Sequence, residues 1–351
     1  MKNKEQIKNI LVTGGAGYIA THTLIELSSN GYDFVVYDNL SNSSLEAVKR
    51  VERIIGKSIE FVEGDIRDKK ALQDLFETYN IDAVVHFAGL KAVGESVKEP
   101  LVYYDNNVHG SLVLFEVMNE FGCKNIVFSS SATVYNEKDA KNYEPLRESD
   151  AVGKTTNPYG TSKYMIERIL HDLYVSDNSW KIVVLRYFNP VGAYESGDIG
   201  EDPSGVPNNL MPFVAQVAVG KREYLSVFGD DYESVDGTGV RDYIHVMDLA
   251  NAHVRALDYI YSNSFKANTS VFNIGTGKGN SVLEMVEAYE EASGKKVAYK
   301  IAPRRAGDIA KCYANATLAK EVLGWEAKRS LKQMCVDSWR WQSKNENGYK
   351  K

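Results

Sequence analysis

The chain has 351 residues, of which 44% are hydrophobic and 25% are charged, and this is the composition of a globular protein with a substantial core. A net charge of −6 argues against nucleic-acid binding through bulk positive charge, and three scattered cysteines indicate neither a disulfide framework nor a zinc site, so no metal is expected. The N-terminal residues carry no long apolar run before a cleavage site, so we expect no signal peptide, no membrane span and a cytoplasmic location.

Short apolar runs alternate with helical patterns through the first half of the chain. Strands are predicted at residues 9–13, 34–37, 59–62, 83–87, 125–128 and 182–185. Helices are predicted at residues 18–30, 44–55, 68–78, 100–121 and 157–174. Continuous apolar strands that alternate with helices are typical of a parallel sheet covered on both faces. The expected fold class is therefore α/β, with a Rossmann-type doubly wound parallel sheet.

The pattern changes after residue 187, where Gly, Pro and Asn cluster up to residue 209 and predict loops. Shorter elements follow, with helices near 210–219, 247–262, 281–292 and 329–343 and strands near 225–228 and 297–302. Two further strands, at 243–246 and 271–274, are in a position to rejoin the first sheet. The predicted domains are residues 1–187, rejoined by residues 241–275, and a smaller mixed α/β domain of residues 188–351.

A glycine-rich turn joins the first strand to the first helix. Gly15, Gly17 and Ala20 match the dinucleotide-binding fingerprint, in which Ala is tolerated at the third place, and Gly14 opens the same turn. Residues without side chains let the backbone approach a pyrophosphate, and a helix N-terminus offers free N–H groups with a partial positive charge. Asp38 ends the second strand, where its carboxylate would accept hydrogen bonds from ribose hydroxyls and repel a 2′-phosphate. These residues favour NAD over NADP.

Three side chains form a candidate catalytic set. Tyr159 and Lys163 are four residues apart on a predicted helix, so they share one face. A neighbouring ammonium, together with the positive nicotinamide of NAD+, would favour the phenolate of a tyrosine that otherwise titrates near pH 10. The phenolate would then take a proton from an alcohol while a hydride leaves its carbon. Ser131, in a hydroxyl-rich stretch at the end of the fifth strand, is a candidate proton or hydrogen-bond partner.

Residues 11–20, with Tyr159 and Lys163, resemble the extended short-chain dehydrogenase/reductase family. Longer stretches narrow the resemblance to its UDP-glucose 4-epimerase branch, over residues 9 to 343; these stretches are residues 86–96, 103–107, 129–135, 185–192, 207–212 and 237–249. The resemblance implies interconversion of UDP-glucose and UDP-galactose through a transient 4-keto sugar, with NAD retained between cycles. It also implies a homodimer packed through helices such as 100–121 and 157–174.

The resemblance implies a set of contacting residues for each ligand. The cofactor residues are Gly14, Gly17, Tyr18, Ile19, Asp38, Asn39, Asn42, Ser43, Asp65, Ile66, Phe87, Ala88, Gly89, Lys91, Asn106, Ser131, Tyr159, Lys163 and Phe188. The residues for the UDP-sugar are Lys91, Ser131, Thr133, Tyr159, Asn189, Asn209, Leu210, Phe228, Arg241, Arg305, Asp308 and Cys312. The residue types fit these ligands, since two arginines suit a diphosphate, an aromatic ring suits a uracil and an acid suits ribose hydroxyls.

Two positions depart from the family pattern. Ala20 replaces the last glycine of the phosphate loop, a change that should only tighten the packing of the helix. Cys312 stands near the sugar pocket, where some members of the family carry a tyrosine. In the family a small residue there accompanies acceptance of N-acetylated sugars, so the resemblance predicts that UDP-GlcNAc and UDP-GalNAc are also interconverted.

Two other functions fit part of the sequence. A nucleotide-sugar 4,6-dehydratase shares the fold and the Tyr/Lys pair, but it needs an acid–base carboxylate pair after the strand-end hydroxyl, and here Thr133 is followed by Val134 and Tyr135. A non-catalytic dinucleotide sensor on the same fold would usually lose the tyrosine or the lysine, and this chain keeps both. Copurified NAD without sugar turnover would favour the sensor.

Overall fold

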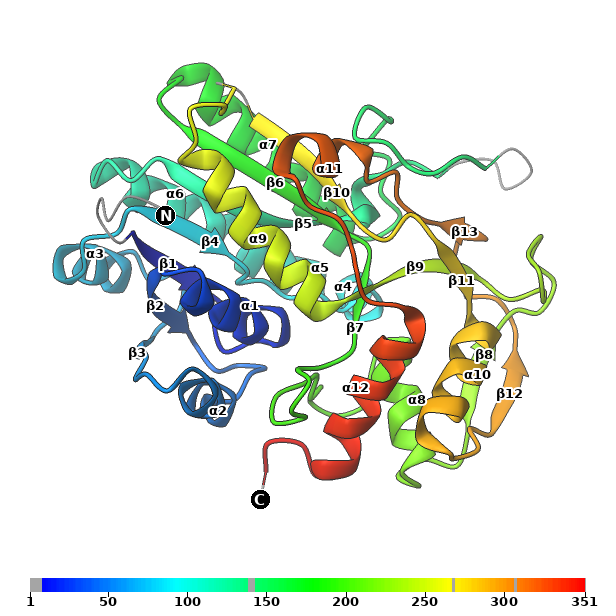
Figure 1. Ribbon diagram of the computed structural model, residues 1–351. Helices are drawn as coiled ribbons and strands as arrows, with labels where there is room; N and C mark the ends of the chain where they lie inside the picture. Colours follow the sequence, from blue (N-terminus) through cyan, green and yellow to red (C-terminus); the bar gives the residue numbers. More distant parts are fainter. Residues whose placement is uncertain (1–7, 138–142, 267–268, 306–307, 351) are drawn as a thin grey trace. The chain divides into compact units, whose positions relative to one another are not determined.

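The computed structural model describes residues 8–137, 143–266, 269–305 and 308–350 (Figure 1). They form two compact units. Unit one contains the described residues up to Val134, together with Asn157–Arg186 and Ala250–Phe272, and unit two contains the rest. Whether residues 1–187 and 188–351 behave as separate domains stays a prediction. No helix in the described ranges is long and apolar enough to cross a membrane.

Unit one is built on a seven-stranded sheet in the order β10-β6-β5-β4-β1-β2-β3. Its strands are β1 (Asn9–Thr13), β2 (Asp33–Asp38), β3 (Glu60–Glu63), β4 (Ala83–His86), β5 (Asn125–Ser131), β6 (Lys181–Tyr187) and β10 (Thr269–Ile274). The ladders from β3 through β2, β1 and β4 to β5 are all parallel. The predicted parallel α/β fold is confirmed.

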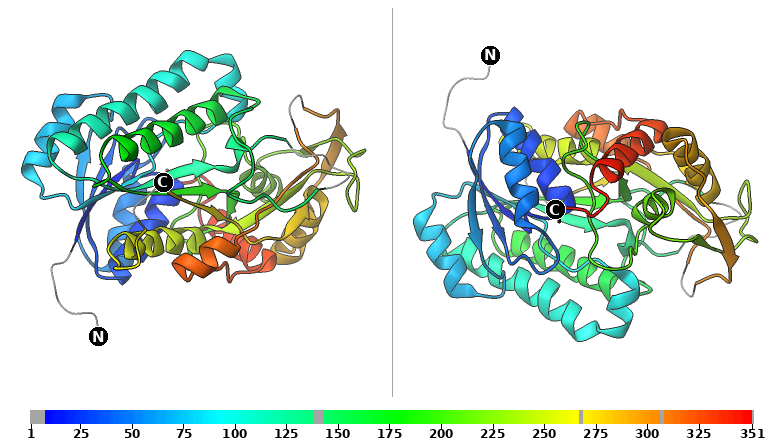
Figure 2. Two further views of the ribbon diagram at one scale, coloured as in Figure 1. Left: turned by 90° about the horizontal axis from the view of Figure 1, so that it is seen from above. Right: turned by 90° about the horizontal axis from the view of Figure 1, so that it is seen from below.

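Helices cover both faces of this sheet, as the view from above in Figure 2 shows. One face carries α3 (Lys69–Thr78), α6 (Gly110–Glu120) and α7 (Pro158–Ser176), whose apolar side chains share a core cluster with the strands. The other face carries α1 (Tyr18–Ser29), α2 (Leu45–Ile55) and α9 (Val246–Ile260). Because both faces are covered, β1, β2, β4 and β6 are buried along most of their length, whereas the edge strand β3 has exposed ends.

The helix predicted at residues 100–121 is interrupted. It consists of α5 (Pro100–Tyr103), a π-helical segment η1 (Tyr104–His109) and α6, and the short helix α4 (Val93–Lys98) precedes it. A π-turn inserts an extra residue, which changes the direction in which the following side chains point. This segment has consequences for the site, as described below.

Unit two contains two smaller sheets. The larger is centred on β9 (Val240–His245), which pairs with β7 (Asn189–Val191), β11 (Gly279–Ser281) and β13 (Lys311–Cys312). The smaller pairs β8 (Leu225–Phe228) with β12 (Tyr299–Ala302). The helices are α8 (Leu210–Ala218), α10 (Val282–Ser293), α11 (Thr317–Leu323) and α12 (Leu331–Lys344).

The prediction that the strand at 243–246 rejoins the first sheet is wrong, whereas the strand at 271–274 does so as β10. The physical reason lies in Asp242, a fully buried residue of β9. Its carboxylate accepts hydrogen bonds from the backbone N–H groups of Thr276 at 2.8 Å, Gly277 at 2.9 Å and Ala314 at 3.1 Å. A buried carboxylate needs such donors, and they tie β9 to the segments of unit two.

Candidate active site

The turn between β1 and α1 requires glycine for two reasons. Gly14 has φ +67°, and a Cβ added there would lie 2.6 Å from the backbone nitrogen of Ala88. Gly17 caps α1 without a side-chain hydrogen bond, and the first turn of the helix contains no acidic residue. The first N–H groups of α1 thus face an open backbone cradle, which fits a pyrophosphate.

Asp38 organises the loop that follows β2. Its Oδ2 accepts a hydrogen bond from the Ala16 backbone N–H at 3.0 Å, and its Oδ1 accepts from the Leu40 backbone N–H and from Ser43 Oγ, each at 2.8 Å. Leu40 has φ +55°, the only positive φ outside glycine among the described residues. A leucine costs free energy in this left-handed region, and the contacts of Asp38 hold it there.

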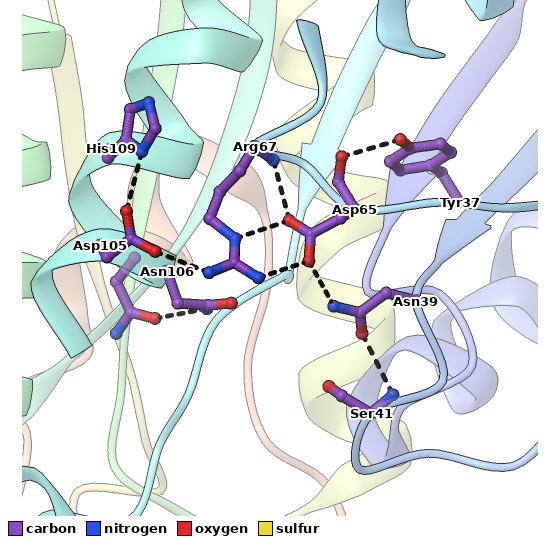
Figure 3. Close-up of polar contacts among 9 residues, drawn as sticks. Tyr37, Asn39, Ser41, Asp65, Arg67, Asp105, Asn106 and His109 are labelled. Atoms are coloured by element: carbon purple, nitrogen blue, oxygen red, sulfur yellow. Dashed lines mark hydrogen bonds and ion pairs between the residues drawn. The ribbon is translucent and has the colours of Figure 1, made fainter. Parts of the chain in front are cut away.

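Figure 3 shows a polar cluster that connects the segment after β3 to η1. Arg67 donates to Asp65 from Nε at 2.9 Å and from Nη2 at 2.7 Å, and it donates from Nη1 to Asp105 at 2.6 Å. Asn39 Nδ2 donates to Asp65 Oδ2 at 2.9 Å. The Arg67 guanidinium holds the pKa of Asp65, and also that of Asp105, below its usual range. Two predicted adenosine-side residues, Asn39 and Asp65, are therefore in contact.

Asn107 in η1 holds the loop after β4, and it is a site residue that the sequence analysis missed. It is 1% exposed. Its Oδ1 accepts from the Leu90 N–H at 2.8 Å, and its Nδ2 donates to the Leu90 carbonyl and to Ser162 Oγ, each at 3.0 Å. The predicted Asn106 instead donates to Asn107 Oδ1 at 2.9 Å. The sequence feature that could have indicated Asn107 is the pair of polar residues, Asn106 and Asn107, within an otherwise apolar helical pattern.

Burial raises the pKa of Tyr159, and hydrogen bonding with the nearby side chain of Ser131 opposes that rise. Thr133 donates to Ser131 Oγ from its backbone nitrogen at 3.2 Å and from Oγ1 at 3.0 Å. A hydroxyl has two acceptor lone pairs and one proton. Because Thr133 occupies both lone pairs, the Ser131 proton is left for the oxygen of Tyr159.

The start of α7 brings Tyr159 to this strand end. Asn157 caps the helix by accepting from the Gly160 N–H at 2.9 Å, and Pro158 occupies the first helical position. Both residue types are favoured there, because the cap satisfies a free N–H group and proline has none to satisfy. A Cβ added at Gly160 would lie 2.9 Å from the Thr133 carbonyl oxygen, so the helix approaches η2 (Ala132–Val134) closely.

Lys163 is 5% exposed and donates from Nζ to the Ser129 carbonyl oxygen at 2.7 Å. Burial lowers the pKa of Lys163 to about 8, and the charge of Glu167 opposes this shift. Lys163 is therefore mainly an ammonium at neutral pH. Its Nζ lies 3.7 Å from the position of a Cβ added at Gly89, so it borders the loop after β4.

The prediction that Lys163 and the nicotinamide of NAD+ together favour the phenolate of Tyr159 stays a prediction, since the protein groups alone act in the opposite direction. Burial raises the pKa of Tyr159, and the hydrogen bond with Ser131 only opposes that shift. The reason is that removing a phenolate from water costs more than the surrounding protein groups return. The predicted lowering of the Tyr159 pKa therefore depends on the positive charge of a bound nicotinamide.

The other predicted cofactor residues lie on the same strand ends and helix starts. Phe87 packs against His253 with ring centroids 4.7 Å apart, and Lys91 Nζ lies 5.9 Å from the centroid of the Tyr18 ring. Ile66 is buried against Gly110, since a Cβ added at Gly110 would lie only 2.6 Å from Ile66 Cδ1. Tyr18 and Ile19 begin α1, Asn42 is exposed in the loop after β2, and Ala88 follows β4.

Unit two brings four of the predicted UDP residues together. The guanidinium of Arg305 lies 4.8 Å from the centroid of the half-exposed Phe228 ring. Arg305 also donates to Asp308 from Nε at 2.8 Å and from Nη2 at 3.2 Å. Arg241 Nη2 lies 3.7 Å from Asp308 Oδ1. An aromatic face, two guanidinium groups and a carboxylate are thus clustered.

Cys312 lies beside this cluster, because it pairs with Arg241 in the ladder between β13 and β9. Burial raises the pKa of the Cys312 thiol to about 11, which the charge of Arg241 opposes, so the thiol is neutral. The remaining predicted residues of unit two lie on other segments. Asn189 begins β7, Leu210 begins α8, Phe188 is buried, and Asn209 donates to Glu201 at 2.8 Å.

Comparisons with known proteins agree with this geometry. The family model of GDP-mannose 4,6 dehydratase matches residues 11–338. UDP-glucose 4-epimerase of Bacillus subtilis (strain 168) is 59% identical over 341 residues, which are 97% of this chain and 98% of that protein. The Homo sapiens UDP-glucose 4-epimerase is 54% identical over 348 residues, 97% of this chain and 98% of that protein.

Solved structures give the same result. The crystal structure of UDP-glucose 4-epimerase from Bifidobacterium longum in complex with NAD+ and UDP has a TM-score of 0.93 and 55% identity, and the match covers 97% of this chain and 100% of that chain. The protein is an enzyme, and it belongs to the UDP-glucose 4-epimerase family, within the extended short-chain dehydrogenases/reductases.

Proposed function

We propose that this protein is an NAD-dependent epimerase that interconverts UDP-glucose and UDP-galactose. The observation that carries the proposal is the pair of Ser131 and Tyr159, with Lys163 on the same helix as Tyr159 and the glycine turn at the end of β1 in the same sheet. The high identity to UDP-glucose 4-epimerases over nearly the full length supports the choice of substrate.

The residues present fit NAD. The open backbone at Gly14 and the uncapped start of α1 suit the pyrophosphate, Asp38 suits the adenosine ribose, and Asn39 with Asp65 suits the adenine side. The relatives crystallised with NAD support this assignment. The chemistry that NAD supplies is the reversible acceptance of a hydride from carbon 4 of the sugar.

In the proposed reaction, Tyr159 takes the proton of the sugar 4-hydroxyl and later returns it. Ser131 donates a hydrogen bond to the Tyr159 oxygen, which stabilises the phenolate form. Lys163 lies on the same face of α7 as Tyr159, and the positive charge of its ammonium favours the phenolate. In unit two, Phe228, Arg241, Arg305 and Asp308 are proposed to bind UDP, so that most of the binding energy comes from the nucleotide and the hexose remains free to turn over.

The proposed function is tested by NMR product analysis of UDP-galactose with purified enzyme and no added NAD. We expect UDP-glucose to form, and we expect Tyr159→Phe to slow its formation by about 10²–10⁴-fold, the usual contribution of a general base. A 4-keto-6-deoxy product would instead show a 4,6-dehydratase. Folded, NAD-loaded protein without turnover of UDP-galactose would refute the proposal in favour of a sensor.

We further propose that Cys312 admits N-acetylated sugars. The side chain is small and uncharged and stands beside Arg241 of the proposed UDP cluster. Cys312→Tyr should abolish turnover of UDP-GlcNAc and retain that of UDP-glucose, measured in parallel by NMR. A wild-type enzyme that turns over UDP-glucose but shows no detectable turnover of UDP-GlcNAc would refute this proposal.

A homodimer is proposed from the surface of unit one. Exposed apolar side chains occur on α4, α5 and α7, which contact one another, and on α6, which contacts η1; these are Val97, Leu101, Val102, Leu112 and Met165. Such a patch on a monomer favours association. A cytoplasmic location is proposed as well, and the free thiols of all three cysteines support a reducing compartment.

A further inference from the structure

Helix α7 carries a third ionisable side chain on the face that presents Tyr159 and Lys163. Glu167 follows Lys163 by four residues, and intervals of four place side chains on one face of a helix. Glu167 is 8% exposed, and the proposed reaction gives it no role. A buried carboxylate is costly unless it is paired, so its partners indicate what it does.

The partners of Glu167 hold it rigidly. Arg186 in β6 donates to Glu167 Oε1 from Nε at 3.1 Å and to Oε2 from Nη2 at 2.7 Å. Ser130 donates to Glu167 Oε1 from its hydroxyl. Because Lys163 donates to the carbonyl of Ser129, the two helix side chains attach to consecutive residues of β5.

Apart from the pair of Glu167 and Arg186, the titratable group that faces Lys163 from β4 in the described part of the chain is a histidine. On β4, the buried ring of His86 contacts Thr13 Oγ1 at 2.7 Å and Ser111 Oγ at 2.9 Å. Burial and the charge of Lys163 lower the pKa of His86 to about 3, so this ring is neutral at physiological pH.

β6 contributes the cation of Arg186, which is paired with Glu167, and β5 places the Phe128 ring centroid 4.9 Å from Lys163 Nζ. β5 contributes the backbone and hydroxyls of Ser129 and Ser130, η1 contributes the amide of Asn107, and α7 contributes the phenol of Tyr159. Glu167 is therefore the acidic group whose charge acts on Lys163.

We propose that Glu167 is a positioning residue for the reaction, whose carboxylate, fixed by Arg186 and Ser130, keeps Lys163 an ammonium directed at Ser129 and so sets the pH range of activity. The inference rests on the proposed function, in which Tyr159 and Lys163 act. Its effect passes through Lys163, since the hydrogen bonds of Glu167 are with Arg186 and Ser130 and not with Ser131 or Tyr159.

The first experiment compares pH profiles of kcat. Glu167→Gln should move the alkaline limb to lower pH by about 1 unit, because an ammonium that loses an opposite charge releases its proton more easily. The KM for UDP-galactose should stay unchanged. Glu167→Asp should restore most of the range. Arg168→Gln, which removes an exposed pair with Asp172 on the same helix, is the matched control and should leave the profile unchanged.

Glu167→Gln leaves the buried Arg186 unpaired, so this variant could fail to fold. A second variant keeps the test valid in that case. Glu167→Met with Arg186→Met removes both charges and should displace the alkaline limb in the same direction but by less than Glu167→Gln, because the cation of Arg186 is lost as well. Direct titration of Lys163 by NMR of ¹³C-labelled lysine, assigned with Lys163→Arg, should show a lower midpoint in both variants.

An unchanged Lys163 midpoint in folded variants would overturn the proposal. If UDP-galactose is not epimerised at all, the proposed function fails, while the NMR titration still decides the role of Glu167.

Discussion

Ser131 receives two hydrogen bonds from Thr133, and this arrangement decides which way its own proton points. A serine with free lone pairs would alternate between donating to Tyr159 and accepting from it. Here the backbone and side chain of Thr133 occupy the acceptor positions at 3.2 and 3.0 Å. Thr133 thereby stabilises the deprotonated form of Tyr159 indirectly, through Ser131.

Thr133→Val should therefore lower kcat about tenfold, equivalent to about 1.4 kcal/mol, because it removes the hydroxyl donor and keeps the side-chain shape. Thr133→Ser retains the donor and should behave like the wild type. Steady-state kinetics with UDP-galactose measures both. Equal kcat for the valine and serine variants would contradict the role assigned to the hydroxyl.

Individual residues differed in how far the sequence could place them. The parallel sheet predicts that Ser131 lies close to Tyr159 and Lys163, because Ser131 ends a predicted strand and the other two begin the helix that follows. Asn107 was missed because helical periodicity assumes 3.6 residues per turn, and η1 departs from it. The contact of Arg67 with Asp105 was not predictable either, because it joins residues 38 positions apart.

At the scale of elements, the turn before α1 combines two constraints that are separable. Gly14 has a positive φ and also a close approach to Ala88, whereas Gly31, after α1, has φ +78° with nothing within 4 Å of an added Cβ. Strain alone acts at Gly31, and strain with a steric clash acts at Gly14.

Gly31→Ala should cost about 1–2 kcal/mol of unfolding free energy, the penalty of a left-handed alanine, and should keep its NAD. Gly14→Ala should be less stable and should purify without NAD, because the clash displaces the loop. Calorimetry and the ratio of absorbance at 260 and 280 nm measure the two effects. Retention of full NAD content by Gly14→Ala would show that the loop tolerates the displacement.

Most strands and helices of unit one were predicted with small errors at their ends, since buried parallel strands are continuously apolar. The exceptions are α4, which was not predicted, and the helix at 100–121, which η1 interrupts. The destination of β9 was not predictable from its own residues. Val240–His245 reads as a buried strand in either sheet, and the choice depends on donors at residues 276, 277 and 314 that bind Asp242. Long-range pairing of this kind leaves no local pattern.

At the scale of the whole molecule, buried thiols make the folded state sensitive to alkaline pH. Burial raises the pKa of Cys123 and of Cys335 to about 12, whereas an unfolded thiol titrates near 8.5. The folded state therefore binds more protons above about pH 8.5, and stability falls there by up to about 1.4 kcal/mol per pH unit for each thiol. Lys163, with a lowered pKa, opposes this trend between about pH 8 and 10.4.

Cys123→Ala removes one buried thiol, so the unfolding free energy should fall less steeply with pH, by up to about 1.4 kcal/mol per pH unit. Urea unfolding at several values between pH 8 and 10 measures the slope. The stability at pH 7 is the internal reference, since the thiol is protonated there in both states. An unchanged slope would show that Cys123 ionises without unfolding.

The proposed dimer is tested at its most exposed apolar residue. Leu101 in α5 is 81% exposed, and Leu101→Glu should convert the dimer to a monomer, because it places a charge in an apolar contact. Val235→Glu, at an 80% exposed valine of unit two, is the matched control and should leave the dimer intact. Light scattering after gel filtration gives the mass. A monomeric wild type would refute the dimer outright.

The position of β10 has a consequence for synthesis of the chain. This strand lies at the edge of the seven-stranded sheet beside β6, yet it is made only after residues 187–249, which belong to unit two. While the ribosome translates that stretch, the backbone of β6 is left as an unpaired edge, the kind of surface on which nascent chains associate wrongly. Unit one is thus completed late, and a chain released before residue 269 would retain that open edge.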